Sequence, residues 1–97
     1  MSRHTYTTMH AGRRTAVVMG YDRPLRYVFM TVEDLDASDD EAAYLYSNLD
    51  QPDPDSLTLD DFRTALQQLG IDVPESLFIE TAADRLNNVG NRTVLHE

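Results

Sequence analysis

Cysteine and lysine are absent from this 97-residue chain, and glycine occurs only four times. Without cysteine, the protein has no disulfide bond, no thiolate nucleophile and no cysteine-ligated zinc or iron–sulfur centre. The four glycines are too scattered to form a phosphate-binding loop. Apolar runs are only a few residues long, and residues 1–10 lack the apolar core of a signal peptide. We therefore expect no membrane span and no secretion signal, and a soluble cytoplasmic protein.

The composition is that of a folded chain of modest size. Hydrophobic residues make up 41% of the chain and aromatic residues 8%, which is well above the level of a disordered protein. We predict a single domain over residues 1–97, because this length is too short for separate substrate and cofactor domains. We expect a monomer or a small homo-oligomer.

Charge is unevenly distributed along the chain, whose net charge is −9. Residues 1–30 carry five arginines and one aspartate, whereas residues 31–61 carry eleven acids and no base. The net charge disfavours binding to nucleic acid or to an anionic membrane, although the basic N-terminal third could still act locally.

Three segments have strand-like patterns. Residues 14–20 and 25–33 alternate as strands do, and both faces of the second segment are largely apolar, which is typical of a central strand. Residues 43–48 predict a short third strand. In an alternative reading, residues 5–9 add a strand at the sheet edge; otherwise residues 1–10 form a flexible N-terminal tail.

Helical patterns occupy the second half of the chain. Two prolines mark residues 50–57 as a linker between a strand part and a helical part. Thr58 and Asp61 have the spacing of a capping box, which predicts a helix start, and Gly70 stands where the left-handed residue after a helix belongs.

A second helix is predicted from Pro74 onward, with Gly90 as its end. Its apolar stripe would consist of Phe78, Ala82, Leu86 and Val89. Residues 93–96 could add a short C-terminal strand. Strands followed by helices predict an α+β fold, in which an antiparallel meander of three or four strands packs two helices on one face.

The sequence Gly-Tyr-Asp-Arg-Pro, residues 20–24, joins the first two predicted strands. The simplest interpretation is a hairpin turn, in which Gly20 supplies an unusual backbone angle and Asp22 bonds the backbone nearby. The functional alternative is a recognition tip, since loops often carry function. Its candidate binding residues are Tyr21, Asp22, Arg23 and Arg26.

Five acids form a candidate acidic surface: Asp34, Asp36, Asp39, Asp40 and Glu41. An EF-hand loop needs glycine at its sixth position and glutamate at its twelfth, and loops that start at Asp34 or Asp36 have neither. We therefore interpret residues 33–42 as a solvated loop, whose acids could meet a basic partner.

Neither the histidines nor the serines match a known site pattern. His4, His10 and His96 lie near the chain ends and lack the i, i+4 spacing of helical zinc ligands, so we interpret all three as surface residues. The serines lack the Gly-x-Ser-x-Gly elbow of a nucleophile. We predict no metal, no cofactor and no catalytic residue.

Arginines interleaved with aromatic residues give the best case for nucleic-acid binding, because an aromatic sheet face rimmed by arginine can stack bases. The residues are Arg13, Arg14, Arg23, Arg26, Tyr21, Tyr27 and Phe29. Tyr27 and Phe29 are explained more simply as core or helix-facing residues, so protein binding is the preferred interpretation.

The phrases AGRRTAVVMGYDRPLRYVFM, YLYSNLD and NNVGNR, taken together, resemble a family of small bacterial proteins of uncharacterised function. The resemblance spans residues 11–92. It implies a bacterial, soluble, single-domain protein with no known cofactor, and it supplies no catalytic residue.

The leading functional hypothesis is a non-enzymatic accessory module that binds another protein, because no catalytic motif is present and the charge asymmetry could orient a partner. One alternative is a nucleic-acid-linked regulator, which either binds nucleic acid through the arginine-rich hairpin or presents its acids as a phosphate mimic. Another is a small enzyme that combines Asp22 and Arg23 with a histidine.

Overall fold

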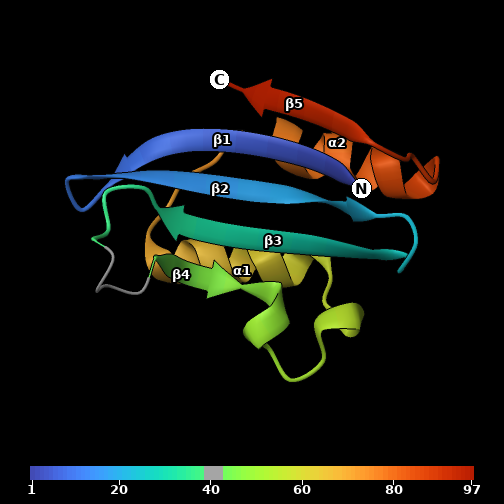
Figure 1. Ribbon diagram of the computed structural model, residues 1–97, viewed down its shortest axis with the longest axis horizontal. Helices are drawn as coiled ribbons and strands as arrows, with labels where there is room; N and C mark the ends of the chain where they lie inside the picture. Colours follow the sequence, from blue (N-terminus) through green and yellow to red (C-terminus); the bar gives the residue numbers. More distant parts are fainter. Residues whose placement is uncertain (39–42) are drawn as a thin grey trace.

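The computed structural model describes residues 1–38 and 43–97, which fold as one five-stranded sheet and two α-helices (Figure 1). The sheet order is β4-β3-β2-β1-β5, with β5 parallel to β1 and the other neighbours antiparallel. The elements are β1 (Ser2–His10), β2 (Arg13–Asp22), β3 (Tyr27–Asp34), β4 (Tyr44–Ser47), α1 (Leu59–Leu69), α2 (Ser76–Leu86) and β5 (Arg92–His96). The predicted α+β class is confirmed, including the C-terminal strand.

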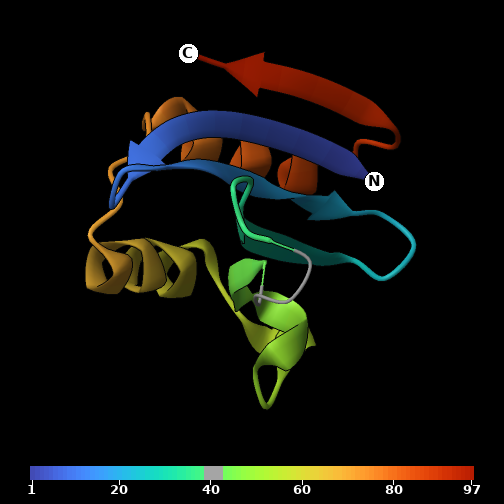
Figure 2. The same ribbon diagram turned by 60° about the vertical axis from the view of Figure 1, so that its left-hand side comes forward.

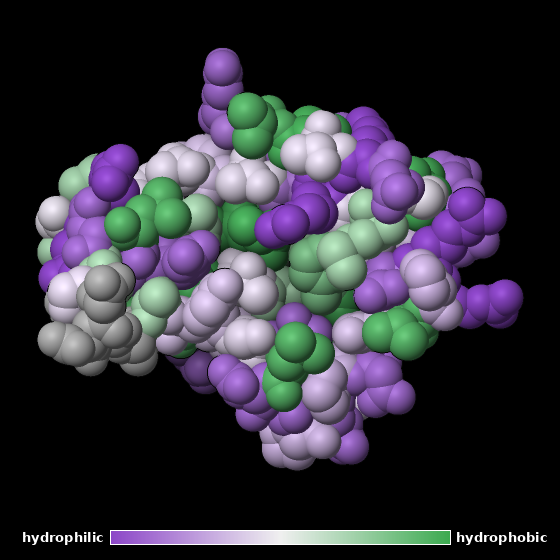
Figure 3. Space-filling view, in the orientation of Figure 1, coloured by the Kyte–Doolittle hydropathy of each residue, from purple (hydrophilic) through white to green (hydrophobic). Residues whose placement is uncertain are grey.

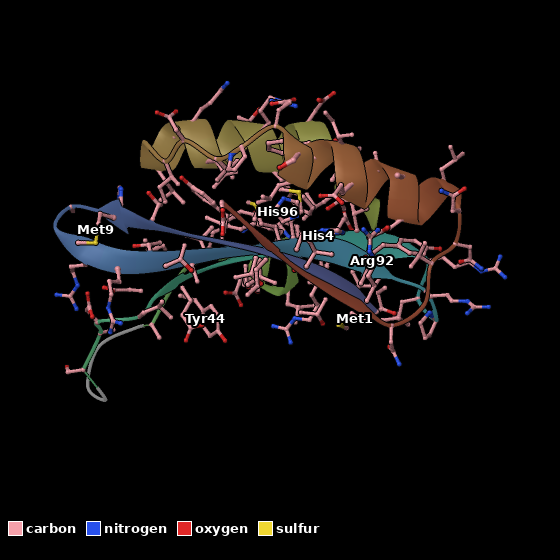
Figure 4. All side chains as sticks on the ribbon, turned by 90° about the horizontal axis from the view of Figure 1, so that it is seen from above. Met1, His4, Met9, Tyr44, Arg92 and His96 are labelled. Atoms are coloured by element: carbon pink, nitrogen blue, oxygen red, sulfur yellow. The ribbon has the colours of Figure 1, made fainter. Side chains whose placement is uncertain are left out.

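Both helices lie on the same side of the sheet, and the hydrophobic core fills the space between the sheet and the helices (Figures 2 and 4). We call the helix-covered side of the sheet the inner face and the other side the open face. Strand alternation sends every second side chain to the inner face. The buried core comprises Val17, Met19, Tyr21, Val28, Met30, Val32, Phe62, Leu66, Ile71, Leu77 and Phe78.

The N-terminal residues are part of the sheet, so the expectation of a flexible tail over residues 1–10 is wrong. The alternative hairpin is confirmed, since β1 pairs with β2 along its length from His4 to His10. Ala11 and Gly12 connect the strands with left-handed φ values of 52° and 78°, as a tight hairpin turn requires. Ser2 and His4 point to the inner face and are fully buried.

Local signals located α1 correctly. Thr58 Oγ1 accepts from the Asp61 N–H at 3.3 Å, and the Thr58 N–H donates to Asp61 Oδ2 at 2.8 Å, so the capping box is formed. Gly70 follows the helix with a left-handed φ of 75°. The preceding linker contains two short 3-10 turns, η1 (Asn48–Asp50) and η2 (Pro54–Ser56).

The predicted apolar stripe of α2 is correct only at Phe78, and the predicted end of the helix at Gly90 is wrong. The buried residues of α2 are Leu77, Phe78, Thr81 and Asp84, whereas Leu86 is 85% exposed. The helix ends through Asn88, which takes the left-handed φ of 50°, and the Val89 N–H donates to the Asp84 carbonyl at 2.9 Å. Periodicity failed here because two positions of the buried stripe hold polar side chains.

The last strand, β5, closes the sheet beside β1, and the register places Val94 opposite His4 and His96 opposite Tyr6. The first and last segments of the chain therefore lie side by side. Among the described residues, no helix is long and apolar enough to cross a membrane.

Candidate metal centre

Two histidines from opposite ends of the chain meet between the β1–β5 strand pair and α2 (Figure 4). His4 Nδ1 lies 2.9 Å from His96 Nε2, and the rings meet edge to face with centroids 5.0 Å apart. His4 is fully buried and the His96 side chain is 4% exposed. The interpretation of these two histidines as surface residues is therefore wrong.

The outward nitrogen of each histidine has a partner on α2. His4 Nε2 lies 2.6 Å from Asp84 Oδ2, and His96 Nδ1 lies 2.8 Å from Ser76 Oγ. Because an ionised carboxylate can only accept, His4 Nε2 must carry a proton. In neutral His4, the lone pair is then on Nδ1, the atom that faces His96.

Asp84 is held as a carboxylate in a buried position. Its Oδ1 accepts from Arg92 Nη1 at 2.9 Å. Burial alone would raise the pKa of Asp84, but hydrogen bonds from His4 and Ser2 and the charges of His4 and Arg92 outweigh burial and lower the pKa below its usual value. Asp84 therefore keeps the charge that orients His4.

The neutral form of His96 is also favoured. Burial lowers the pKa of His96, the nearby Glu80 carboxylate raises it, and the charges of His4 and Arg92 lower it again, with a net lowering. A neutral imidazole is the form that binds metal ions. Electrostatics thus leave His96 in a state able to act as a ligand.

Glu80, on the adjacent turn of α2, supplies a third donor. Its Oε2 lies 3.2 Å from His96 Nε2, and its Oε1 accepts from Arg92 Nη2 at 3.2 Å. His4, Glu80 and His96 offer ligand atoms that all lie within 4.8 Å of one another. A tetrahedral zinc ion with bonds of about 2.1 Å separates its ligand atoms by about 3.4 Å, so the two imidazoles need to part by only about 0.5 Å to accept one.

Sequence reasoning missed this cluster because His96 is 92 residues from His4, and Asp84, which orients His4, is 80 residues from it. A hint was present in β1, where Ser2, His4 and Tyr6 alternate as a strand does. A second hint was the position of Asp84 on the same helical face as Leu77 and Thr81. Neither hint predicts a site without knowing that β5 pairs with β1, because that pairing brings His96 next to His4.

The residues of the predicted recognition tip do not all lie in the turn. Tyr21 lies within β2, buried on the inner face, and its Oη donates to Asn88 Oδ1 at 2.8 Å. The turn itself consists of residues 23–26. Asp22 Oδ1 accepts from the Leu25 N–H at 3.2 Å, and Arg26 takes the left-handed φ of 58°.

The prediction that Gly20 supplies an unusual backbone angle to the turn is wrong. It lies inside β2, and its φ is not left-handed. A Cβ at this position would collide with the Ser2 carbonyl and lie 2.8 Å from the Phe29 ring. Gly20 is therefore required for close packing.

Two of the predicted acidic residues bind arginines. Asp34 Oδ2 lies 2.7 Å from Arg13 Nε, and Asp36 Oδ1 lies 2.9 Å from Arg14 Nη2. Hydrogen bonds from the backbone and side chain of Arg14 hold the pKa of Asp36 below its usual value. The other predicted acids, Asp39, Asp40 and Glu41, lie outside the described residues.

These ion pairs also change the predicted nucleic-acid surface. Arg13 and Arg14 are engaged with acids, and Tyr21 faces the core. Tyr27 and Phe29 project from the open face, because their neighbour Val28 faces the core. Asp22 projects from the open face and His4 from the inner face, so the sheet separates these two residues of the small-enzyme hypothesis.

Comparison with models of protein families, with curated proteins and with solved structures finds no match to this chain. The resemblance to small bacterial proteins stays a prediction.

Proposed function

We propose that this protein is a non-enzymatic metal-binding module that holds one Zn²⁺ ion with His4 Nδ1, His96 Nε2 and Glu80 Oε2. The observation that carries the proposal is the 2.9 Å approach of two imidazole nitrogens whose opposite ring nitrogens are already hydrogen-bonded. Each imidazole is thus oriented with a nitrogen toward the same point.

The surroundings of the three donors match those of known metal sites. A histidine ligand usually donates its other N–H to a carboxylate or another oxygen, which fixes its tautomer and orientation. Asp84 fills this role for His4, and Ser76 fills it for His96. In the absence of metal, a proton on His96 Nε2 can bridge to His4 Nδ1, and the ion would replace that proton.

The donor set and its burial favour zinc. Two imidazoles and a carboxylate suit both Zn²⁺ and Fe²⁺, but iron centres of this type keep more open positions. Here His4 is buried, His96 is 4% exposed and Glu80 is 34% exposed, so solvent reaches the three donors mainly at Glu80. The same burial restricts access for a substrate and supports a structural role.

Isothermal titration and native mass spectrometry of the chelator-treated protein will test the proposal. We expect one Zn²⁺ per chain, and visible absorption of the Co²⁺ form should show tetrahedral geometry. Glu80→Gln and His96→Ala should each weaken zinc affinity by at least about tenfold, which is about 1.4 kcal/mol. Ser76→Ala, which removes only the partner of His96 Nδ1, should weaken it by about 10- to 100-fold.

Two variants serve as matched controls. His10→Ala removes the histidine at the far end of β1, and Glu97→Gln removes an exposed acid next to His96. Both should bind zinc like the unmodified protein. Binding that is lost in His10→Ala, or that survives unchanged in both Glu80→Gln and His96→Ala, would overturn the proposal.

A further inference from the structure

The last strand, β5, contributes almost nothing to the hydrophobic core. None of its five residues belongs to the buried core or to the apolar residues packed against it, and Val94 is its only half-buried apolar side chain. Leu95 is 77% exposed. By contrast, β2 and β3 each supply three core residues. Burial of apolar surface is the main stabilising term in folding, so β5 gains little from it.

The same strand is attached to the sheet along one side only. It pairs with β1 from Ser2 opposite Arg92 to Tyr6 opposite His96, and no described strand lies on its other side. Figure 3 shows both hydrophobic and hydrophilic groups at the surface along this edge, at the top of the view. Segments with few buried contacts are the parts of a fold that detach most readily.

Polar side chains at the two ends of β5 hold it against α2 (Figure 4). At the start of the strand, Arg92 donates to Asp84 Oδ1 at 2.9 Å and to Glu80 Oε1 at 3.2 Å. At its end, His96 Nε2 lies 2.9 Å from His4 Nδ1. The Arg92 side chain is 43% exposed, and solvent weakens its ion pairs. The more deeply buried anchor is therefore His96, which is 4% exposed.

The connection from α2 to β5 shows which residues would move with the strand. Tyr21 Oη donates to Asn88 Oδ1 at 2.8 Å, and the Val89 N–H donates to the Asp84 carbonyl at 2.9 Å. The chain is thus anchored to the core as far as Val89. Detachment of β5 would move only residues 90–97.

This movement would separate the proposed zinc ligands. His4 lies on β1 and Glu80 on α2, and both stay with the core, whereas His96 leaves with β5. The three donors come together only when β5 is docked. A ligand that binds one of two states stabilises that state, so zinc must favour the docked strand.

We infer that zinc acts as a latch on β5. Without the metal, β5 detaches from β1 far more often than the rest of the sheet separates, and bound zinc suppresses this motion. The inference rests on the proposed zinc site. A detached β5 exposes the edge of β1 from Ser2 to Tyr6, and an exposed strand edge can pair with another strand. Zinc therefore controls which strand forms this edge of the sheet.

Amide hydrogen exchange of the ¹⁵N-labelled protein, measured by NMR in the metal-free and zinc-saturated states, will test the latch. In the metal-free protein, the hydrogen-bonded amides of β5 should exchange at least about tenfold faster than those that pair β2 with β3. Saturation with zinc should slow the β5 amides by at least about tenfold. The amides of β4, at the opposite edge of the sheet, should keep their exchange rates, because β4 carries no zinc ligand.

Three variants separate the latch from general stability. Glu80→Gln leaves the residues of β5 unchanged, and at a zinc concentration that saturates only the unmodified protein its β5 amides should show no slowing by zinc. Arg92→Gln removes the other anchor and retains all three donors, so β5 should exchange faster without zinc, and zinc should still slow it. Glu97→Gln is the matched control and should respond to zinc like the unmodified protein.

Two results would overturn the latch alone. One is exchange of the β5 amides, in the metal-free protein, that is as slow as exchange of the amides that pair β2 with β3. The other is stoichiometric zinc binding that does not slow the β5 amides. Absence of zinc binding in calorimetry would overturn the proposed function and the latch together.

Discussion

Thr81 and Asp84 share the buried face of α2, but only one of them is satisfied. Asp84 accepts from His4 and Arg92, so its charge is balanced inside the protein. Thr81 is fully buried, and its Oγ1 has no hydrogen-bond partner. A residue's polarity therefore does not show whether it stabilises this core; its partners do.

We expect Thr81→Val to raise the free energy of unfolding by about 1 kcal/mol, because valine keeps the shape and removes the unpaired hydroxyl. Thr81→Ala also removes the hydroxyl but leaves a small cavity, so it should be less stable than Thr81→Val. Urea denaturation monitored by circular dichroism will measure both. A loss above about 1 kcal/mol in Thr81→Val would show that the hydroxyl has a partner in solution.

At the level of elements, the features that could be predicted from the sequence are those determined by interactions between residues close in the chain. The capping box and Gly70 bounded α1, because both ends depend on residues within one turn of the helix. The inner stripe of α2 could not be predicted in the same way. Asp84 is stable there because His4, 80 residues away, and Arg92 both donate to it. The proposed zinc site was missed for the same reason.

The cap of α1 can be tested directly. Thr58→Ala removes the side chain that accepts from the Asp61 N–H, so it should lower the free energy of unfolding by about 1 kcal/mol, whereas Thr58→Ser should retain most of the stability. Thr64→Ala is the control, because Thr64 is exposed within α1 and alanine favours helix. An equal loss in Thr64→Ala would mean that the cap is not the cause.

At the scale of the whole molecule, acidic residues outnumber basic ones. The chain carries 17 acids and eight arginines. Salt weakens exposed ion pairs such as Arg63 with Glu75, but such pairs contribute only about 0–1 kcal/mol each. Repulsion among the excess acids is screened as well, and it acts across the molecule. We expect the second effect to dominate.

Raising sodium chloride from 20 to 300 mM should therefore stabilise the protein. A gain of about 1 kcal/mol would raise the melting temperature by about 4–8 °C for a domain of this size. The double substitution Asp53→Asn with Asp55→Asn removes two exposed acids and should reduce the salt dependence. Thermal melts of both proteins at each salt concentration will measure the salt dependence. A lower melting temperature of the unmodified protein at high salt would contradict the expectation.

The parallel pairing of β1 with β5 has a mechanical consequence. The chain enters the sheet at the start of β1 and leaves it at the end of β5, so its two ends lie toward opposite ends of the same strand pair (Figure 1). Force applied to the ends pulls the two strands past each other along their length and loads their hydrogen bonds together. The fold therefore resists stretching in shear, and it cannot be unzipped one hydrogen bond at a time from its termini.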